Sequence, residues 1–298
     1  MLTARFGRIV ALFALVGLGA AGCGKKGADQ AHKDPTGKKI ALRMNYTQGQ
    51  AFDFTMGMDM TMNIKAQGQK VKANMGMTMV MGMDVKDVSP DGIGTVDVTY
   101  RTIKFSVTGG PQTVSYDSTQ GSKGDQLSRA LGALIDKTLT LQLDPKGKVI
   151  SVKGGDAIVQ AMRDSGDAAM ADQMKSQFSD EAMEQMFGQI AGALPPNPVD
   201  NGDSWNQSFN MSGQQPMKVD ARYKLLDHGA GKSSIGVSGK MKSTGAAQGL
   251  SGDMYGTIDL DEQTGWPVKA SMTMEFSGDV GPASMDAEGT MTMSTVKK

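Results

Sequence analysis

The sequence is poor in the side chains from which most catalytic sites are built. It has one cysteine in 298 residues, and His32 and His228 are its only histidines. A single cysteine excludes an intrachain disulfide. The sequence contains no Gly-x-Ser-x-Gly elbow, no His-Glu-x-x-His pair and no phosphate-binding glycine loop. These absences predict a protein that is not an enzyme and that holds no cofactor.

The chain also lacks an excess of charge of either sign. Residues 1–22 contain Arg5 and Arg8 but no acidic residue, so their removal leaves 29 basic and 31 acidic side chains. A nearly neutral surface gives neither nucleic acid nor an anionic membrane an electrostatic hold. No apolar run after residue 22 is long enough to cross a bilayer. We therefore expect no nucleic-acid partner, and we expect membrane attachment to come from a lipid alone.

The first 23 residues predict a lipoprotein export signal. A basic start is followed by an apolar run from Ile9 to Leu18 and by the small residues of Gly19–Gly22, directly before Cys23. This arrangement is typical of an export signal and too short for a mature membrane helix. Small residues before a cysteine resemble the lipobox of bacterial lipoproteins, although Ala20 stands where leucine is more usual. Cys23 is the predicted lipidation site; an ordinary secretory signal with a chance cysteine is the alternative.

The segment after Cys23 predicts the location and the attachment of the protein. Gly24 is not the aspartate associated with inner-membrane retention in some bacteria, so we expect a cell-envelope lipoprotein on the periplasmic side of the outer membrane. Residues 24–39 have no apolar periodicity and predict a flexible tether. The predicted organisation is a signal peptide at 1–22, a lipidated tether at 23–39 and a single β-rich domain at 40–298.

Two methionine-rich stretches stand out in the mature chain. Methionine occupies every second position of each stretch, and most of the intervening positions are polar or glycine. The residues are Met56, Met58, Met60, Met62, Met75, Met77, Met79, Met81 and Met83. Strict alternation predicts two strands with one dry face and one wet face, paired through a tight turn at Gln67–Lys70. About 13 residues at about 3.3 Å each give a strand of about 40 Å, which is typical of a strongly curved sheet.

The remaining pattern predicts a mainly β (α+β) fold. We expect long curved antiparallel sheets, or a half-barrel, formed by two meanders at 40–153 and 203–298. A helical insert at 154–196, rich in Ala, Met, Gln and Glu, is expected to cover the concave face. In the strand that follows the turn at 89–92, apolar residues switch from even to odd positions, and this switch predicts a β-bulge at 101–102.

Several short segments carry a family resemblance. They are Leu141–Val149, Leu194–Pro196, Val199, Gly202–Trp205 and Asp261–Trp266. Through them the chain resembles, over about residues 40–296, uncharacterised bacterial lipoproteins grouped by a domain of unknown function. The resemblance implies no activity, and its pattern does not include the methionine stretches. In fold alone, long curved strands with a helical cover are similar to periplasmic carriers of lipoproteins or lipids.

The methionines admit three interpretations. They fill a core in place of Leu or Val, they line a pocket for an apolar ligand of adaptable shape, or their thioethers bind Cu(I). We favour a binding or structural module whose methionine-lined face holds a lipid or another hydrophobic small molecule. Periplasmic Cu(I) binding is the alternative. Asp203 and Trp205 form the most prominent polar–aromatic cluster, and we interpret it as a strand start with a core tryptophan.

Overall fold

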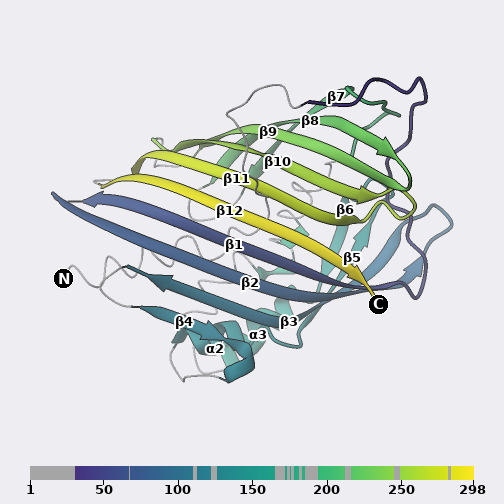
Figure 1. The fold of residues 1–298 in the computed structure, drawn as a ribbon. Helices are drawn as coiled ribbons and strands as arrows, with labels where there is room; N and C mark the ends of the chain where they lie inside the picture. Colours follow the sequence, from purple (N-terminus) through teal and green to yellow (C-terminus); the bar gives the residue numbers. More distant parts are fainter. Residues whose placement is uncertain are drawn as a thin grey trace.

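The computed structural model describes residues 31–66, 68–109, 113–121, 126–164, 194–211, 216–244, 249–280 and 283–298, together with residues 172, 175, 178–180, 183 and 184. Most of these residues belong to one 12-stranded antiparallel sheet (Figure 1). Its strand order is β6-β5-β3-β2-β1-β12-β11-β10-β9-β8-β7, and β4 pairs with β3 beside this path. The sheet is open, with β6 and β7 at its edges. The prediction of a mainly β fold with a long antiparallel sheet is confirmed.

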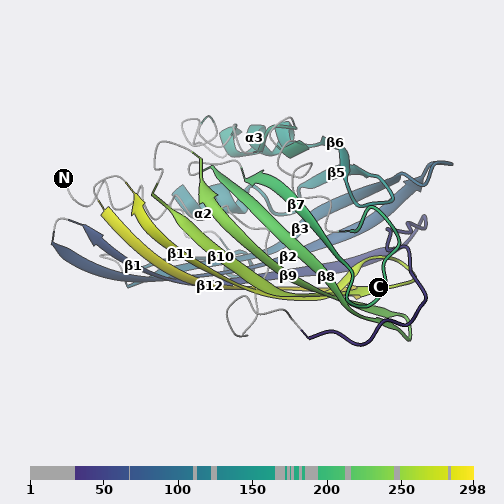
Figure 2. The same ribbon diagram turned by 90° about the horizontal axis from the view of Figure 1, so that it is seen from above.

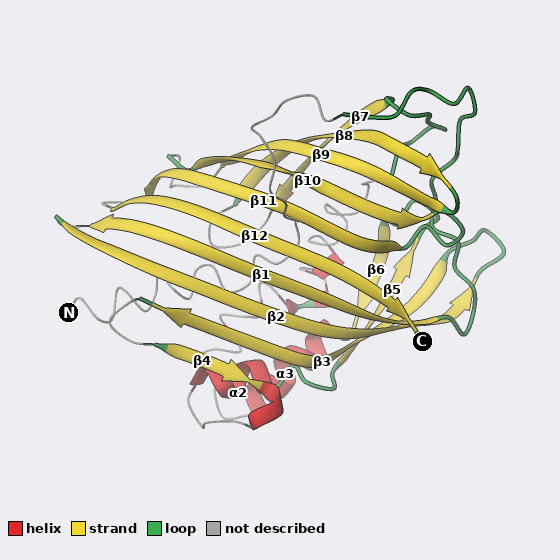
Figure 3. Ribbon diagram, in the orientation of Figure 1, coloured by secondary structure: helices red, strands yellow, loops and turns green. Residues whose placement is uncertain are grey.

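The strands are long, and strand dominates the described chain (Figure 3). They are β1 Ala51–Ala66, β2 Gln69–Val88, β3 Gly94–Thr108, β4 Val114–Asp117, β5 Thr138–Leu143, β6 Val149–Lys153, β7 Ser204–Met211, β8 Met217–Gly229, β9 Lys232–Ser243, β10 Ser251–Asp261, β11 Pro267–Val280 and β12 Ala283–Lys297. A short 3₁₀ helix η1 (Ser118–Gln120) and the helices α2 (Gln126–Gly132) and α3 (Gly155–Asp164) complete the described elements.

The two methionine stretches form the predicted hairpin. β1 and β2 pair antiparallel, and Met58 lies opposite Met77. Every even residue of β1 from Phe52 to Ile64 is buried, while most odd residues are partly or fully exposed. The hairpin therefore has the dry face and the wet face that period-two alternation predicts.

The predicted bulge lies in β3 opposite β2. Val80 is paired with Thr102, and the next residue, Met81, is paired with Tyr100, so Arg101 is the extra residue. One inserted residue reverses the face on which the following side chains lie. The apolar residues Tyr100 and Ile103 consequently both reach the dry face, although their positions differ in parity. The predicted turn at 89–92 is closed by a backbone hydrogen bond, as are the turns at 144–147 and 261–265 within two of the family segments.

The two meanders are joined by a pairing that the sequence did not predict. β1 pairs with β12 along its whole length, so that the first and last strands are neighbours. Thr292 lies opposite Gly57, where a Cβ atom would come within 2.9 Å of its hydroxyl oxygen. Both meanders are thus parts of one continuous sheet rather than two sheets packed on each other.

The described helices lie on the concave side of the sheet (Figure 2). α3 buries Ile158, Val159 and Met162 against the same core as the strands. Its first amide is capped from the chain further on, because Asp180 Oδ1 accepts from Gly155 N at 2.6 Å. The rest of the predicted helical insert, from 165 to 193, lies largely outside the described residues. No helix in the described ranges is long and apolar enough to span a bilayer.

Candidate functional site: the methionine face

The concave face of the sheet carries more methionine than the hairpin alone supplies. Met58 is flanked by Met77 on β2 and by Met291 on β12, and Met291 is flanked in turn by Met272 on β11. We call the buried side of β1, β2 and β10–β12 the methionine face. Its further members from the C-terminal meander are Met254, Met272, Met274, Met285, Met291 and Met293. The sequence predicted the two methionine ladders but not that the last strands would extend them.

Burial divides this face into two parts. Met58, Met62, Met75 and Met291 are at most 2% exposed and form a closed core. In contrast, four methionines on the same face are only partly buried; they are Met79, Met81, Met83 and Met293. They gather at the end where β1 begins, since Met79 lies opposite Met56, and Met56 lies opposite Met293. Of the nine predicted ligand-binding methionines, this end contains the three that are accessible: Met79, Met81 and Met83.

Aromatic side chains line that end, which we call the aromatic end. The ring centroid of Trp266 lies 5.0 Å from that of Phe52 and 6.0 Å from that of Tyr46. Phe54 is buried between Met81 of β2 and Thr295 of β12. Burial raises the pKa of Tyr46, and the neighbouring Asp144 carboxylate adds to this shift. Tyr46 therefore stays protonated and donates to the carbonyl oxygen of Asp144 at 3.1 Å.

The convex face offers a different surface. A shallow hollow of about 890 Å³ on β7–β11 is lined by polar and charged side chains that include Asp220, Arg222 and Glu275. Such a lining suits water and ions rather than an apolar molecule. The methionine face is therefore the better candidate for a hydrophobic ligand.

The described residues supply no conventional metal site. No group of three or more His, Cys, Asp or Glu side chains in these ranges is arranged to hold a metal ion. The neutral thioethers of Met58 and Met77 do lie side by side, but inside a core where each is at most 7% exposed. Cys23, the predicted lipidation site, lies outside the described residues.

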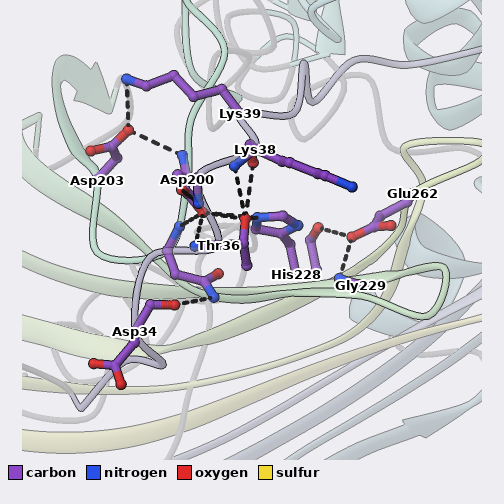
Figure 4. A network of polar contacts seen from close by, with 12 residues as sticks. Asp34, Thr36, Lys38, Lys39, Asp200, Asp203, His228, Gly229 and Glu262 are labelled. Carbon is purple, nitrogen blue, oxygen red and sulfur yellow. Dashed lines mark hydrogen bonds and ion pairs between the residues drawn. The ribbon is translucent and has the colours of Figure 1, made fainter.

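A second cluster fixes residues 33–40 to the domain (Figure 4). Asp200 is its centre: Oδ1 accepts from the backbone N of Thr36 at 3.0 Å, and Oδ2 accepts from the N of Gly37 at 2.8 Å. Ile40 and Val199 exchange both backbone hydrogen bonds. The polar composition of 24–39 predicted a flexible tether, but the part from residue 33 onward is held by these contacts.

The electrostatics of the cluster favour the ionised carboxylates. Hydrogen bonds from the backbone of Thr36, and then from His228, hold the pKa of Asp200 well below its usual range. The pKa of Asp203 is lowered by the backbone N–H of Asp200 and by Lys39, whose Nζ lies 3.2 Å from Oδ2. Both carboxylates are thus charged at neutral pH and act as acceptors that join two distant segments.

His228 and Thr36 do not form a nucleophilic pair. His228 Nε2 lies 3.1 Å from Asp200 Oδ1 and 3.3 Å from Thr36 Oγ1, so one ring nitrogen faces both groups. In a catalytic triad the carboxylate and the hydroxyl meet opposite ring nitrogens. Here an Nε2–H group of His228 donates to Asp200, and Thr36 Oγ1 also donates to Asp200, at 2.9 Å. The arrangement binds the segment and does not activate the hydroxyl.

The predicted polar–aromatic cluster separates into two roles. Asp203 faces Lys39 and the backbone of Asp200, whereas Trp205 is buried and stacks on Tyr223 at 5.7 Å. The interpretation as a strand start with a core tryptophan is confirmed. Sequence reasoning did not foresee that the Gly202–Trp205 segment receives the N-terminal residues. Gly202 is the one residue of this segment whose type reflects the contact. Its φ is +89°, and the His32 ring packs against it.

Comparisons with known proteins place this fold. No curated protein sequence matches the chain. Lipovitellin, in a structure described by its lipid–protein interactions, is 8% identical with a TM-score of 0.52; the match covers 84% of this chain and 25% of lipovitellin. The chain thus spans about a quarter of that protein, and the likeness is one of fold. The COG4313 outer membrane channel from Pseudomonas putida F1 is 6% identical over 89% of this chain and all of that one, with a TM-score of only 0.25.

The sequence comparison identifies the family. The profile of a family of unknown function, DUF6263, matches residues 91–267. The methionine hairpin of β1 and β2 precedes this range, whereas the segment that receives residues 33–40 lies within it. Because the match spans more than half of the 298 residues, this chain belongs to the DUF6263 family.

Proposed function

We propose that this protein is a lipid-anchored lipoprotein of the bacterial cell envelope that holds a lipid or another hydrophobic molecule and catalyses no reaction. The observation that carries the proposal is the change in burial along the methionine face. A face needed only as core would be closed along its whole length, yet Met79, Met81, Met83 and Met293 stay partly exposed at the aromatic end. The fold shared with lipovitellin supports the same function.

The chemistry of the aromatic end suits an acyl chain. Thioether side chains are flexible and polarizable, so they adapt to apolar partners of varied shape. Each methylene of a ligand removed from water there contributes about 0.8 kcal/mol.

The N-terminal cluster fits attachment through a lipid on Cys23. Ten peptide steps separate Cys23 from Lys33, the first of the described residues with a backbone hydrogen bond to the sheet, and they span at most about 35 Å when fully extended. Lys33 N donates to the carbonyl oxygen of Leu226 at the end of the sheet where β8 turns into β9. This attachment would keep that end of the domain near the membrane surface, on the periplasmic side of the outer membrane.

The copper alternative has weaker support. Cu(I) accepts thioether ligands, but most methionines that face one another across strands belong to the close-packed core around Met58. In the row at the aromatic end, Met79 and Met293 are separated by Met56, which is only 3% exposed. An ion there would displace packing contacts rather than enter an open site. Met81 and Met83 are instead paired with Phe54 and Phe52.

Native mass spectrometry of the full mature chain tests the ligand. We expect an additional mass that organic extraction removes, and uptake of the apolar dye diphenylhexatriene by the extracted protein. Met81→Gln should weaken dye uptake, because it places an amide among apolar side chains. Thr78→Gln, on the exposed face of the same strand, should leave it unchanged. A single clean mass together with no dye uptake would refute ligand binding.

The anchor is tested separately by metabolic labelling with palmitate. We expect the wild-type chain to take up label and to fractionate with membranes. The Cys23→Ser variant should do neither. Equal labelling of both chains would refute lipidation at Cys23 without bearing on the ligand.

A further inference from the structure

Two polar atoms are buried at the aromatic end without a partner. Among the described residues, nothing accepts from Trp266 Nε1, and Thr295 Oγ1 makes no hydrogen bond. Trp266 is only 5% exposed. An unpaired buried donor destabilises a protein, so such atoms are rare where a side chain serves packing alone. Both atoms therefore call for an acceptor.

The two residues are neighbours on the methionine face. Thr295 lies opposite Phe54 in the β1–β12 pairing. Phe54 and Phe52 are successive buried residues on the same face of β1. The Trp266 ring packs against Phe52, with 5.0 Å between the ring centroids, so Trp266 and Thr295 both lie beside this buried aromatic pair. A tryptophan N–H and a threonine O–H thus border the patch formed by Met81 and Met293.

A cation stands at the rim of the same patch. Lys297 follows Thr295 by two residues, so it belongs to the same face of β12, and it is exposed opposite Phe52. The other lysine at this terminus, Lys298, is engaged with Asp53 at 3.0 Å. The end of the apolar patch therefore presents two buried donors and a positive charge, a combination that suits a carboxylate.

We propose that the ligand is a long-chain fatty acid whose carboxylate accepts from Trp266 Nε1 and Thr295 Oγ1 and is paired with Lys297 at the rim. Its alkyl chain lies along Met81, Met79 and Met293. This inference rests on the proposed binding of a hydrophobic ligand and adds the class of its head group and its direction. The face has no second polar end of this kind in the described residues. The other buried polar atoms without a hydrogen bond lie on other surfaces: Asp53 Oδ1, which is ion-paired with Arg101 and Lys298, and Asn201 Oδ1.

The head group would lie at the end of the sheet that also holds the N-terminal segment. Asn45 Nδ2 donates to the carbonyl oxygen of Gln263 at 2.7 Å, in the turn that leads into Trp266. Glu262 of the same turn accepts from Gly229 N at 2.9 Å, beside the site that fixes residues 33–40 (Figure 4). A fatty acid would enter with its tail first and leave its carboxylate nearest the anchored side.

Titration with cis-parinaric acid, a fluorescent fatty acid, tests the head group in the delipidated full mature chain. Thr295→Val and Trp266→Phe should each raise its Kd about tenfold or more, because each removes a hydrogen bond to a charged group. Thr295→Ser, which keeps the hydroxyl, should bind like wild type. Thr290→Val, on the exposed face of β12, is the matched control and should have no effect.

Diphenylhexatriene, which has no head group, separates this inference from the proposed function. Its Kd should be unchanged in Thr295→Val and Trp266→Phe. If the dye binds but neither variant shifts the Kd of parinaric acid by more than twofold, the carboxylate site is refuted and ligand binding stands. If neither probe binds the wild-type chain, both proposals fail.

Discussion

Replacement of Met58 by alanine tests the division of the methionine face into a closed core and an accessible end. The side chain is 1% exposed and loses three heavy atoms in this substitution. At about 0.8 kcal/mol for each methylene-sized group, the transfer term is about 2.4 kcal/mol. If roughly 50 Å³ stays unfilled, the cavity adds about 1.2 kcal/mol. We therefore expect Met58→Ala to lower the free energy of unfolding by about 3–4 kcal/mol.

Met81→Ala is the matched comparison, because the residue lies on the same face but is partly exposed. This substitution should lower the free energy of unfolding by about 1 kcal/mol, since water already reaches the side chain and no closed cavity forms. The loss of unfolding free energy in Met58→Ala and in Met81→Ala is measured by urea unfolding, followed by far-ultraviolet circular dichroism. The two variants are compared only if their m-values are equal. Met58→Leu, which keeps the volume, should cost less than about 1.5 kcal/mol. Equal losses for Met58→Ala and Met81→Ala would refute the division.

Three further predictions concern the bulge, the N-terminal segment and copper. Deleting Arg101 should remove the bulge and leave the chain able to fold, because Tyr100 and Thr102 keep their partners Met81 and Val80 and the apolar residues of β3 then alternate without interruption. Arg101→Ala should change the free energy of unfolding by less than about 1 kcal/mol, because it removes only the exposed ion pair with Asp53. A deletion variant that fails to unfold cooperatively would contradict this reading of the bulge. The lowered pKa of Asp200 stabilises the fold above the unfolded-state value of about 3.9, and this contribution is lost as pH falls through the folded-state value. Protection of the Gly37 amide from hydrogen exchange should therefore decline progressively as the pH falls from about 4 toward the lowered pKa of folded Asp200, and should be lost at neutral pH in Asp200→Asn. Retained protection in both cases would refute the role of the carboxylate. The chain should not compete with a Cu(I) chelator, and competition abolished by Met58→Leu with Met77→Leu would instead support the copper alternative.

Local rules made the methionine hairpin predictable. Alternation assigns each side chain to a face, and the turn at 261–265 depends on residues within a few positions, as does the one at 144–147. The bulge at Arg101 was readable for the same reason, because a change of phase within one strand needs an inserted residue. Such features are encoded over fewer than ten residues, so one sequence suffices to locate them.

The pairing of β1 with β12 is not encoded in this way. Strands with the same alternation present equivalent backbone edges, so the residues of β12 do not determine that β1 is the strand it pairs with. The contact between the N-terminal segment and Asp200 could not be predicted from the sequence either. The donors are the backbone N–H groups of Thr36 and Gly37, which every non-proline residue has. The candidate site was predicted in part: the positions of the methionines followed from periodicity, but their exposure depends on what covers the sheet.

Substitution of Thr295 tests whether its unpaired hydroxyl is retained for ligand binding or serves only the packing of the fold. A buried hydroxyl without a partner costs about 1–3 kcal/mol, and valine has nearly the same shape without this cost. Thr295→Val should therefore raise the unfolding free energy of the ligand-free chain, measured by urea unfolding. The same substitution should reduce the stabilisation by saturating parinaric acid, which at 100 times the Kd is about 2.7 kcal/mol for the wild-type chain. A gain without ligand together with a loss with ligand is the signature of a group retained for binding. If Thr295→Val instead destabilises the ligand-free chain, the hydroxyl serves the fold, and its place in the carboxylate site would have to be abandoned.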